Sequence, residues 1–510
     1  MSAPPPSPIV PEAAQGDRRM AERVLVLGAS GYIGRHLTPR LATMGYAVTA
    51  AARRTAAMAA EGWDGVAIKP ADALDYDSLR AALTGQDVVY YLVHAMAAGG
   101  DFPARDRAAA ANLARAAGDA GVRRIVYLGG LAPRNPDTAH LASRIETGAL
   151  LREGPVEVVE IRAGIVIGAG SAAFEVMRDL VAHLPAMVTP RWVRAQSPPV
   201  ALDDLLATMI ALARAPGAGG QVFEVGGPQR MSYEQMMRAL ARLMGRRAPI
   251  IIPVPLLTPE LSSWWLALIS ATPVNVARAL ITGLRYDLSA DDASLRAIMP
   301  PPATDFETAV TRVFEQERAM LAVDRWREGA FDLRGRRHDV SFYGKSLTRS
   351  ADIAAPPGAV WRTVAMIGGP EAGYFALAPL WRARRWLERR LGGDAAPRRG
   401  AQALAAGLRF DGWRVLAAAP GARLTLVSTV TGPGAGGLEI ALAPLPQSAT
   451  RLDATLHWHP AGALGLLYWF VLWPLRALAL GAMARAIARR AAADQSSALA
   501  AARAMSGSRK

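Results

Sequence analysis

One twelve-residue stretch near the N-terminus, residues 23–34 (Arg-Val-Leu-Val-Leu-Gly-Ala-Ser-Gly-Tyr-Ile-Gly), constrains the fold more than any other part of the chain. Its apolar run, Val24–Leu27, is typical of a parallel strand that is covered on both faces. Gly28, Gly31 and Gly34 follow with the spacing G-x-x-G-x-x-G. Glycines at these points allow a sharp turn, a close approach of the backbone to a diphosphate, and tight packing of the next helix. A strand before the glycines and a helix after them predict a doubly wound α/β domain that binds a dinucleotide.

The residues at the end of the second strand indicate which of the two nicotinamide dinucleotides the chain binds. An NAD site usually has an acidic residue after the second strand, where it binds the ribose 2′-hydroxyl. Here residues 47–54 end in Arg53 and Arg54, whose guanidinium groups suit a 2′-phosphate. We therefore expect NADP(H) in preference to NAD(H). The residues expected to contact the cofactor are Gly28, Ala29, Ser30, Gly31, Tyr32, Ile33, Gly34, Arg53, Arg54, Asp72, Ala73, Leu92, Val93 and His94.

Several segments beyond the glycine loop resemble one branch of the atypical short-chain dehydrogenase/reductases. That branch contains the NmrA-like proteins and the Rossmann accessory subunit of mitochondrial complex I, and the resemblance covers roughly residues 22–320. The segments that carry it are 28–34, 72–75, 124–131, 160–168, 170–175, 199–204, 224–228 and 273–275. The last third resembles the DUF2867 domain, which is similar to helix-grip folds of the START/polyketide-cyclase type, through residues 342–345, Trp361, 367–369 and 467–469. This combination is typical of bacterial SDR-family oxidoreductases.

The resemblance and the alternating elements imply four parts. We expect a disordered tail over 1–21, a Rossmann-type doubly wound parallel sheet with a small substrate lobe over 22–325, a charged linker over 326–340, and an α+β helix-grip domain over 341–505. Residues 222–228 should add a short strand to the edge of the first sheet. The strands expected in the second domain are 408–417, 422–431, 437–445 and 450–459, followed by one long helix from about residue 464.

The usual catalytic pair of a short-chain reductase is missing. Such enzymes use a tyrosine and a lysine four residues later, but the only lysine before residue 345 is Lys69, which precedes the fourth strand. His140 and Arg144 stand at the corresponding helix positions, and we take them as the candidate catalytic residues. Histidine exchanges protons near neutral pH, whereas arginine can hold a ribose or a phosphate but cannot act as a base. The alternative is that His140 caps or packs the helix while Arg144 pairs with a neighbouring acid or a phosphate.

Composition removes several other classes of function. The absence of cysteine excludes a disulfide framework and thiolate metal sites, and fits a cytoplasmic protein. The net charge of +15 comes almost entirely from arginine, and no recognition helix or zinc finger accompanies it, so we expect no nucleic-acid partner. His457 and His459 have no cluster of further ligands beside them, and we expect no metal site.

Three segments raise the question of a membrane. Residues 259–271 (with two tryptophans) and the Trp/Arg helix 381–390 suit a peripheral membrane contact, although packing against their own domains is the favoured interpretation. The apolar run 461–475 is too short to span a bilayer and contains Pro474. We expect it to be the gripping helix of the second domain, lining an apolar cavity.

The sequence therefore favours an NADP(H)-dependent oxidoreductase that acts on a small hydrophobic carbonyl or quinone-like substrate. Two alternatives stay open. One is a non-catalytic NADP(H)-binding redox sensor or assembly factor, which the missing tyrosine–lysine pair favours. The other is a carrier of an apolar ligand through the C-terminal domain.

Overall fold

The computed structural model describes residues 21–53, 55–59, 61–94, 102–133, 136, 138–254, 286–320, 341, 344–390, 399–400, 402–429 and 432–507. Some features of the sequence analysis lie outside these residues. They are the predicted tail up to residue 20, Arg54, segments 259–271 and 273–275, linker 326–340 and residues 342–343.

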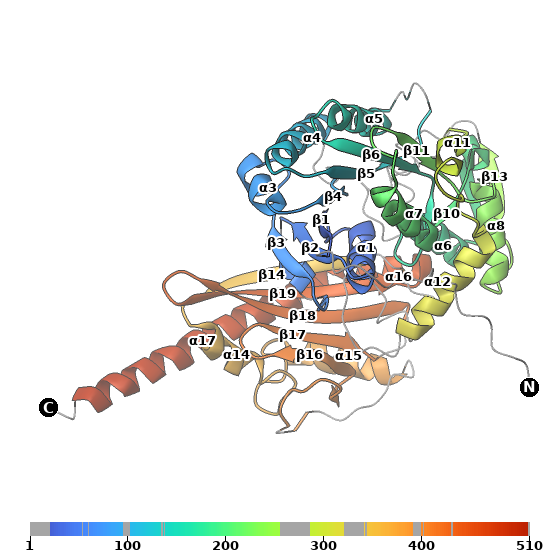
Figure 1. Ribbon diagram of the computed structural model, residues 1–510. Helices are drawn as coiled ribbons and strands as arrows, with labels where there is room; N and C mark the ends of the chain where they lie inside the picture. The colour runs from blue at the N-terminus through green and yellow to red at the C-terminus, as the bar shows by residue number, and fades with distance from the viewer. Residues whose placement is uncertain are drawn as a thin grey trace, which may run out of the picture.

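The N-terminal domain is built on a seven-stranded parallel sheet with the order β11-β6-β5-β4-β1-β2-β3 (Figure 1). The strands are β1 Arg23–Leu27, β2 Ala47–Ala52, β3 Ala67–Pro70, β4 Val88–Tyr91, β5 Arg124–Gly130, β6 Glu157–Ala163 and β11 Val222–Val225. On one side of β1 lie β2 and then β3. On the other side lie β4, β5 and β6, in that order. The strand order therefore reverses beside β1, as in a Rossmann-type sheet, and β11 occupies the edge as predicted.

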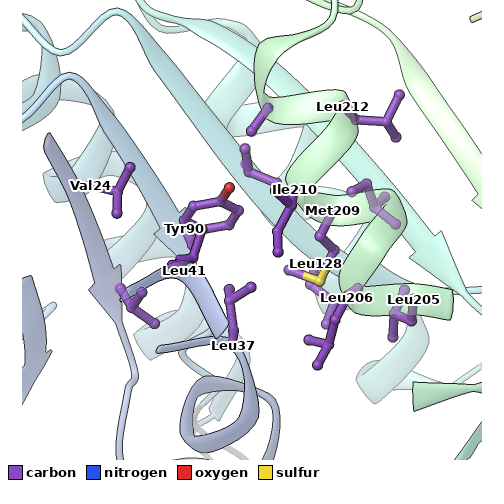
Figure 2. Close-up of a cluster of buried hydrophobic side chains, with 14 of the residues drawn as sticks. Val24, Leu37, Leu41, Tyr90, Leu128, Leu205, Leu206, Met209, Ile210 and Leu212 are labelled. Atoms are coloured by element: carbon purple, nitrogen blue, oxygen red, sulfur yellow. The ribbon is translucent and has the colours of Figure 1, made fainter. Parts of the chain in front are cut away.

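Helices cover both faces of this sheet, in keeping with the apolar run Val24–Leu27 in β1. Its side chains alternate between the two faces, and Val24–Leu27 are all buried. Val24 packs with Leu37 of α1 and Met209 of α7, and Figure 2 shows α1 and α7 closing on Tyr90 of β4 from two sides. The opposite face is covered by α3, α4 and α5. The helices are α1 Tyr32–Thr43, α2 Ala56–Ala59, α3 Tyr76–Leu83, α4 Phe102–Asp119, α5 Ala139–Arg152 and α7 Leu202–Arg214.

A small lobe accompanies the sheet, in line with the lobe expected within residues 22–325. The helices are α6 Ala172–His183, η2 Arg191–Arg194, α8 Tyr233–Leu243, α11 Ala293–Arg296 and α12 Phe306–Met320. Helices α6, η2, α8 and α12 share one apolar core, whereas Leu295 of α11 packs into the core of the parallel sheet. A buried ion pair joins Arg178 of α6 to Glu317 of α12 at 2.6 Å. Three short strand pairs complete the lobe: β7 Val166–Ile167 with β10 Val200–Ala201, β8 Ala186–Pro190 with β13 Ile250–Val254, and β9 Gln196–Ser197 with β12 Met231–Ser232.

The C-terminal domain is a six-stranded antiparallel sheet with the order β14-β19-β18-β17-β16-β15. Its strands are β14 Lys345–Ile353, β15 Arg409–Phe410, β16 Trp413–Ala419, β17 Arg423–Ser428, β18 Gly434–Leu445 and β19 Ala449–Pro460. The helices are α14 Pro357–Val364, α15 Ala378–Arg390, α16 Gly462–Val471 and α17 Trp473–Gly507. Val360 of α14 and Met483 and Ile487 of α17 are buried against the sheet. The second domain is thus α+β, as predicted.

One expected element differs from the structure. The apolar run near residue 464 was predicted to start a single long helix, but α16 and α17 are separate helices bent by 56° at Leu472. Pro474 lies in the first turn of α17, where its missing N–H and fixed φ are tolerated. It is α17 that packs along the sheet, whereas α16 lies beside α6 where the two domains meet (Figure 1).

In the described part of the chain, no single helix combines the length and the hydropathy needed to cross a bilayer. Helices α16 and α17 have the necessary length and hydropathy only when they are taken together across their bend.

Candidate functional site

The glycine loop between β1 and α1 has the geometry that its spacing predicts. Gly28 has φ +96°, and a Cβ atom there would lie 3.1 Å from the backbone of Leu92. A Cβ atom at Gly34 would lie 2.5 Å from the carbonyl oxygen of Gly28. Gly31 is the N-cap of α1, and the first turn of this helix contains no acidic residue. The N-terminus of α1 therefore presents free N–H groups and a positive dipole end, which suit a diphosphate.

A pocket of about 430 Å³ opens at the carboxyl ends of β1, β2 and β4. This is where ligands bind in open parallel sheets whose strand order reverses, and the volume is in the usual range for a ligand site. The lining residues are Leu27, Gly28, Ser30, Gly31, Ala52, Arg53, Ala71, Asp72, Ala73, Leu74, Leu92, Val93, His94, Arg105, Asp106 and Ala109. The structure thus brings most of the predicted cofactor residues together around one cavity.

Four of the predicted cofactor residues stand behind the pocket instead of lining it. Ala29 is fully buried in the core, and Gly34 packs on the backbone of Gly28 and Ala29. The ring of Tyr32 packs edge-on against His36, with the ring centres 5.1 Å apart. Ile33 packs against the core of the sheet. These residues support the loop, and their contact with a cofactor stays a prediction.

Seven lining residues are absent from the predicted set. Leu27, Ala52, Ala71 and Leu74 lie at the ends of the strands or directly after them, and Arg105, Asp106 and Ala109 lie on α4. Asp106 is buried and accepts a hydrogen bond of 3.0 Å from the Ser143 hydroxyl, which ties α4 to α5. The available signal was a run of three charged residues, Arg105–Arg107, on a helix that is otherwise rich in alanine.

The candidate catalytic residues lie on α5, next to the carboxyl end of β5. A Cβ atom at Gly130 would lie 2.7 Å from Nη1 of Arg144. The Tyr127 hydroxyl donates a hydrogen bond of 3.0 Å to the carbonyl oxygen of Arg144. The ring of His94 stands edge-on to that of Tyr127, with the centres 6.3 Å apart. A lining residue of the pocket is thereby linked through Tyr127 to Arg144.

The guanidinium group of Arg144 is buried, and its Nε has no hydrogen-bond partner among the described residues. Burial lowers its pKa, and the neighbouring Tyr127 and Asp106 oppose this effect. An arginine side chain nevertheless keeps its charge in proteins. The site therefore holds a fixed positive charge at the end of β5.

Both histidines of the cluster are held neutral. Burial, followed by the charge of Arg144, lowers the pKa of His140 to about 4. Burial also lowers the pKa of His94 well below its ordinary value, and the nearby charge of Arg144 acts in the same direction. At neutral pH, His140 consequently cannot act as an imidazolium acid, which limits the role that the sequence analysis gave it.

The other candidate sites have structural partners. His459 hydrogen-bonds the carbonyl oxygen of Ser341 at 3.1 Å, and Nε2 of His457 lies 3.8 Å from Glu439. In α15, Trp381 stacks on Tyr374 with ring centres 4.2 Å apart. In the part of the chain that is described, no group of three histidine, aspartate or glutamate side chains is arranged to hold a metal ion.

Two family models match the chain. Residues 28–152 match the NAD(P)H-binding family, and residues 347–483 match the family described as protein of unknown function DUF2867. The glycine cradle and the pocket lie within the first match or directly before it. An NAD(P)H-binding domain of the NmrA-like type is therefore followed by a DUF2867 domain.

Individual proteins also show similarity. A curated relative, (4-alkanoyl-5-oxo-2,5-dihydrofuran-3-yl)methyl phosphate reductase of Streptomyces griseus, is 28% identical over 232 residues, covering 44% of this chain and 74% of the relative. A triphenylmethane reductase of Citrobacter sp. complexed with NADP(H) has 17% identity and a TM-score of 0.47, covering 57% of this chain and 99% of that one. An NADPH-dependent quinone oxidoreductase of Escherichia coli has 19% identity and a TM-score of 0.46, with the same coverage.

Proposed function

We propose that this chain, an NAD(P)H-binding domain followed by a DUF2867 domain, is an NADPH-dependent reductase of small hydrophobic acceptors of the carbonyl or quinone type. The observation that carries the proposal is the pocket at the carboxyl ends of the parallel strands, lined by the glycine loop and by Arg53 and His94. The loop suits the diphosphate, and Leu92 and Val93 provide an apolar wall beside it.

The preference for NADPH rests on the end of β2. Ala52 and Arg53 both line the pocket, and Arg53 is exposed to it without an acidic residue on the same strand end. A guanidinium group forms strong charge-assisted hydrogen bonds with a phosphate. The 2′-phosphate of NADPH would therefore find a partner where an NAD site has a carboxylate. The carboxylate of Asp72, which follows β3, would accept a hydrogen bond from the adenine amine.

The charge states around α5 support a particular type of acceptor. A bound reduced nicotinamide would supply the hydride. Arg144 holds a positive charge that stabilises negative charge developing on an acceptor oxygen. His140 is neutral and gives no proton as an acid at pH 7. The site thus suits conjugated acceptors, such as quinones and unsaturated ketones or lactones, whose reduced anion is stable until it takes a proton from water.

The curated relative supports the same class. Its substrate, by name, is a 5-oxo-2,5-dihydrofuran, which is an unsaturated ring lactone. An ordinary aldehyde or ketone differs because its reduction leaves a strongly basic alkoxide that needs a proton in the same step.

The neutral state of His140 also favours a second candidate function, a redox sensor that binds NADP(H) without turnover. Oxidation of NADPH by the purified full chain decides between the two. We expect oxidation with quinones and unsaturated lactones and little with simple aldehydes. Arg144→Ala should lower kcat by about 100-fold, the effect of losing one charge-stabilising group, and leave NADPH affinity unchanged.

The matched control is Arg107→Ala, which removes an exposed arginine from α4 that pairs with Glu146 at 3.2 Å. This variant should keep full activity. Tight NADPH binding with no acceptor-dependent oxidation would refute the proposal of a reductase and support that of a redox sensor. Equal rates with aldehydes and quinones would refute the argument from charge states.

A further inference from the structure

The outward face of α16 is apolar, whereas a helix on the surface of a globular protein normally turns polar side chains to solvent. Its exposed large side chains recur with helical spacing: Leu464, Leu467, Phe470 and Val471. The opposite face is packed, since Leu466 and Trp469 are buried. Helix α16 therefore uses one apolar face for the fold and presents a second one to the surroundings.

Exposed apolar residues continue along the chain beyond the bend, in the first turns of α17. Trp473, Leu475 and Leu478 are also exposed. Together with the four residues of α16 they form what we call the elbow face, whose exposed fractions run from 42% at Leu475 to 74% at Leu464. No charged residue occurs between residues 461 and 475. Scattered exposed apolar residues are normal, but a contiguous patch of this kind marks an interaction surface.

Positive charge adjoins the elbow face. Along α17, Leu478 follows Leu475 by three residues, the exposed Arg485 follows Leu478 by seven, and the exposed Arg489 follows Arg485 by four, which places all four on one side of the helix. Within the bend, the guanidinium group of Arg476 lies over the ring of Tyr468 at 4.7 Å. Residues 341–510 as a whole contain 21 arginines and lysines and 8 acidic residues.

We propose that the elbow face docks on the surface of a bilayer that contains anionic lipids. Leu464, Leu467 and Phe470 enter the boundary of the acyl chains, while Arg485 and Arg489 contact the headgroup phosphates. An apolar face next to basic residues is the pattern of interfacial helices. With ten residues, α16 is about 15 Å long, half of the hydrocarbon thickness, so it lies in the interface.

The charge distribution favours an anionic bilayer over a second copy of the chain as the partner of the elbow face. Two C-terminal domains that met through this face would bring together two strongly basic surfaces, which repel each other. Anionic headgroups neutralise the same charge. The docking surface is also separate from α15, the helix that the sequence analysis considered for this role. There Trp386 is 60% exposed, but Arg390 stacks over its ring at 5.2 Å.

Vesicle flotation of the full chain tests the proposal, with vesicles of phosphatidylcholine alone and with added phosphatidylglycerol. We expect the protein to float with the anionic vesicles, to remain unbound with the neutral ones, and to be released by high salt, which screens the arginines. The double variant Leu467→Glu/Phe470→Glu should lower the partition by at least about tenfold. NADPH binding and the unfolding temperature of this variant report that it is folded.

Met44→Glu is the matched control, because Met44 is 55% exposed at the end of α1; this variant should float like the wild type. The proposal is overturned if the wild type ignores anionic vesicles or if the double variant binds them equally well. Loss of binding in Trp386→Glu alone would move the surface to α15. A dimer in light scattering that the double variant dissociates, without any vesicle binding, would assign the elbow face to a second copy.

Discussion

The two sheets of this protein differ in how much of their surface remains available for binding. In the N-terminal sheet, helices cover both faces, and β1 is buried from Val24 to Leu27. In the C-terminal sheet, the side chains of β14 alternate between buried and solvent-facing positions. A sheet that is covered twice can bind a ligand only at the ends of its strands, which is where the pocket lies. The C-terminal domain instead offers outer surfaces, among them the elbow face with its seven exposed apolar side chains.

The largest expected effect compares the same substitution in the two domains. Gly34→Ala places a Cβ atom 2.5 Å from the Gly28 carbonyl oxygen, and overpacking of this kind costs about 3 kcal/mol. Gly358→Ala adds a Cβ atom in open space on α14 and should be neutral or slightly stabilising. Thermal unfolding and NADPH titration of both variants measure the difference. Unimpaired NADPH binding by Gly34→Ala would contradict the tight contact between α1 and β1.

The second prediction concerns the cofactor end of the parallel sheet. Arg53→Ala should weaken NADPH binding by about 10- to 100-fold, because a charge-assisted hydrogen bond contributes about 1.5–3 kcal/mol. NADH, which has no 2′-phosphate, should bind as before. Calorimetry with both nucleotides gives the two affinities, and Arg80→Ala on α3 is the control. If both nucleotides lose affinity equally, the assignment of NADPH fails.

The smallest effect is a pH dependence confined to the N-terminal domain. Because the pKa of His140 falls to about 4 on folding, the unfolded chain binds its proton more readily, and stability is lost as pH falls from about 6.5 toward 4. His140→Gln should remove about 1–2 kcal/mol of this loss at pH 5, a figure reduced for the partial exposure of the ring. Urea unfolding at pH 7 and pH 5 checks it. Parallel losses in the variant and the wild type would show that His140 is not held neutral.

The sequence predicted the parallel sheet well because its signals are local. An apolar strand, three glycines and the arginine after the second strand all lie within residues 23–54, and the chain ends of parallel strands meet at one edge. Arg105 and Asp106 escaped notice for the opposite reason. They reach the pocket only because α4 packs back on the sheet and Asp106 bonds to Ser143, a contact between residues 37 positions apart.

The charge state of His140 and the exposure of one face of α16 could not be predicted from the sequence either. A histidine at position 140 suggests proton exchange, but its neutral state comes from burial and from Arg144 in the folded domain. The run 461–475 suggests one buried helix, because apolar residues are usually buried. Pro474 was visible as a helix-start signal, yet nothing local says that one face of α16 stays in contact with solvent.

The approach of Gly462 to His183 has a mechanical consequence. Gly462 has φ +71°, and any Cβ atom at the start of α16 would lie 3.2 Å from the imidazole at the end of α6. At this point the backbone of one domain consequently lies directly against a side chain of the other. A displacement of α16 toward α6 has to push against His183, so a force that acts on the C-terminal domain reaches the end of α6 directly.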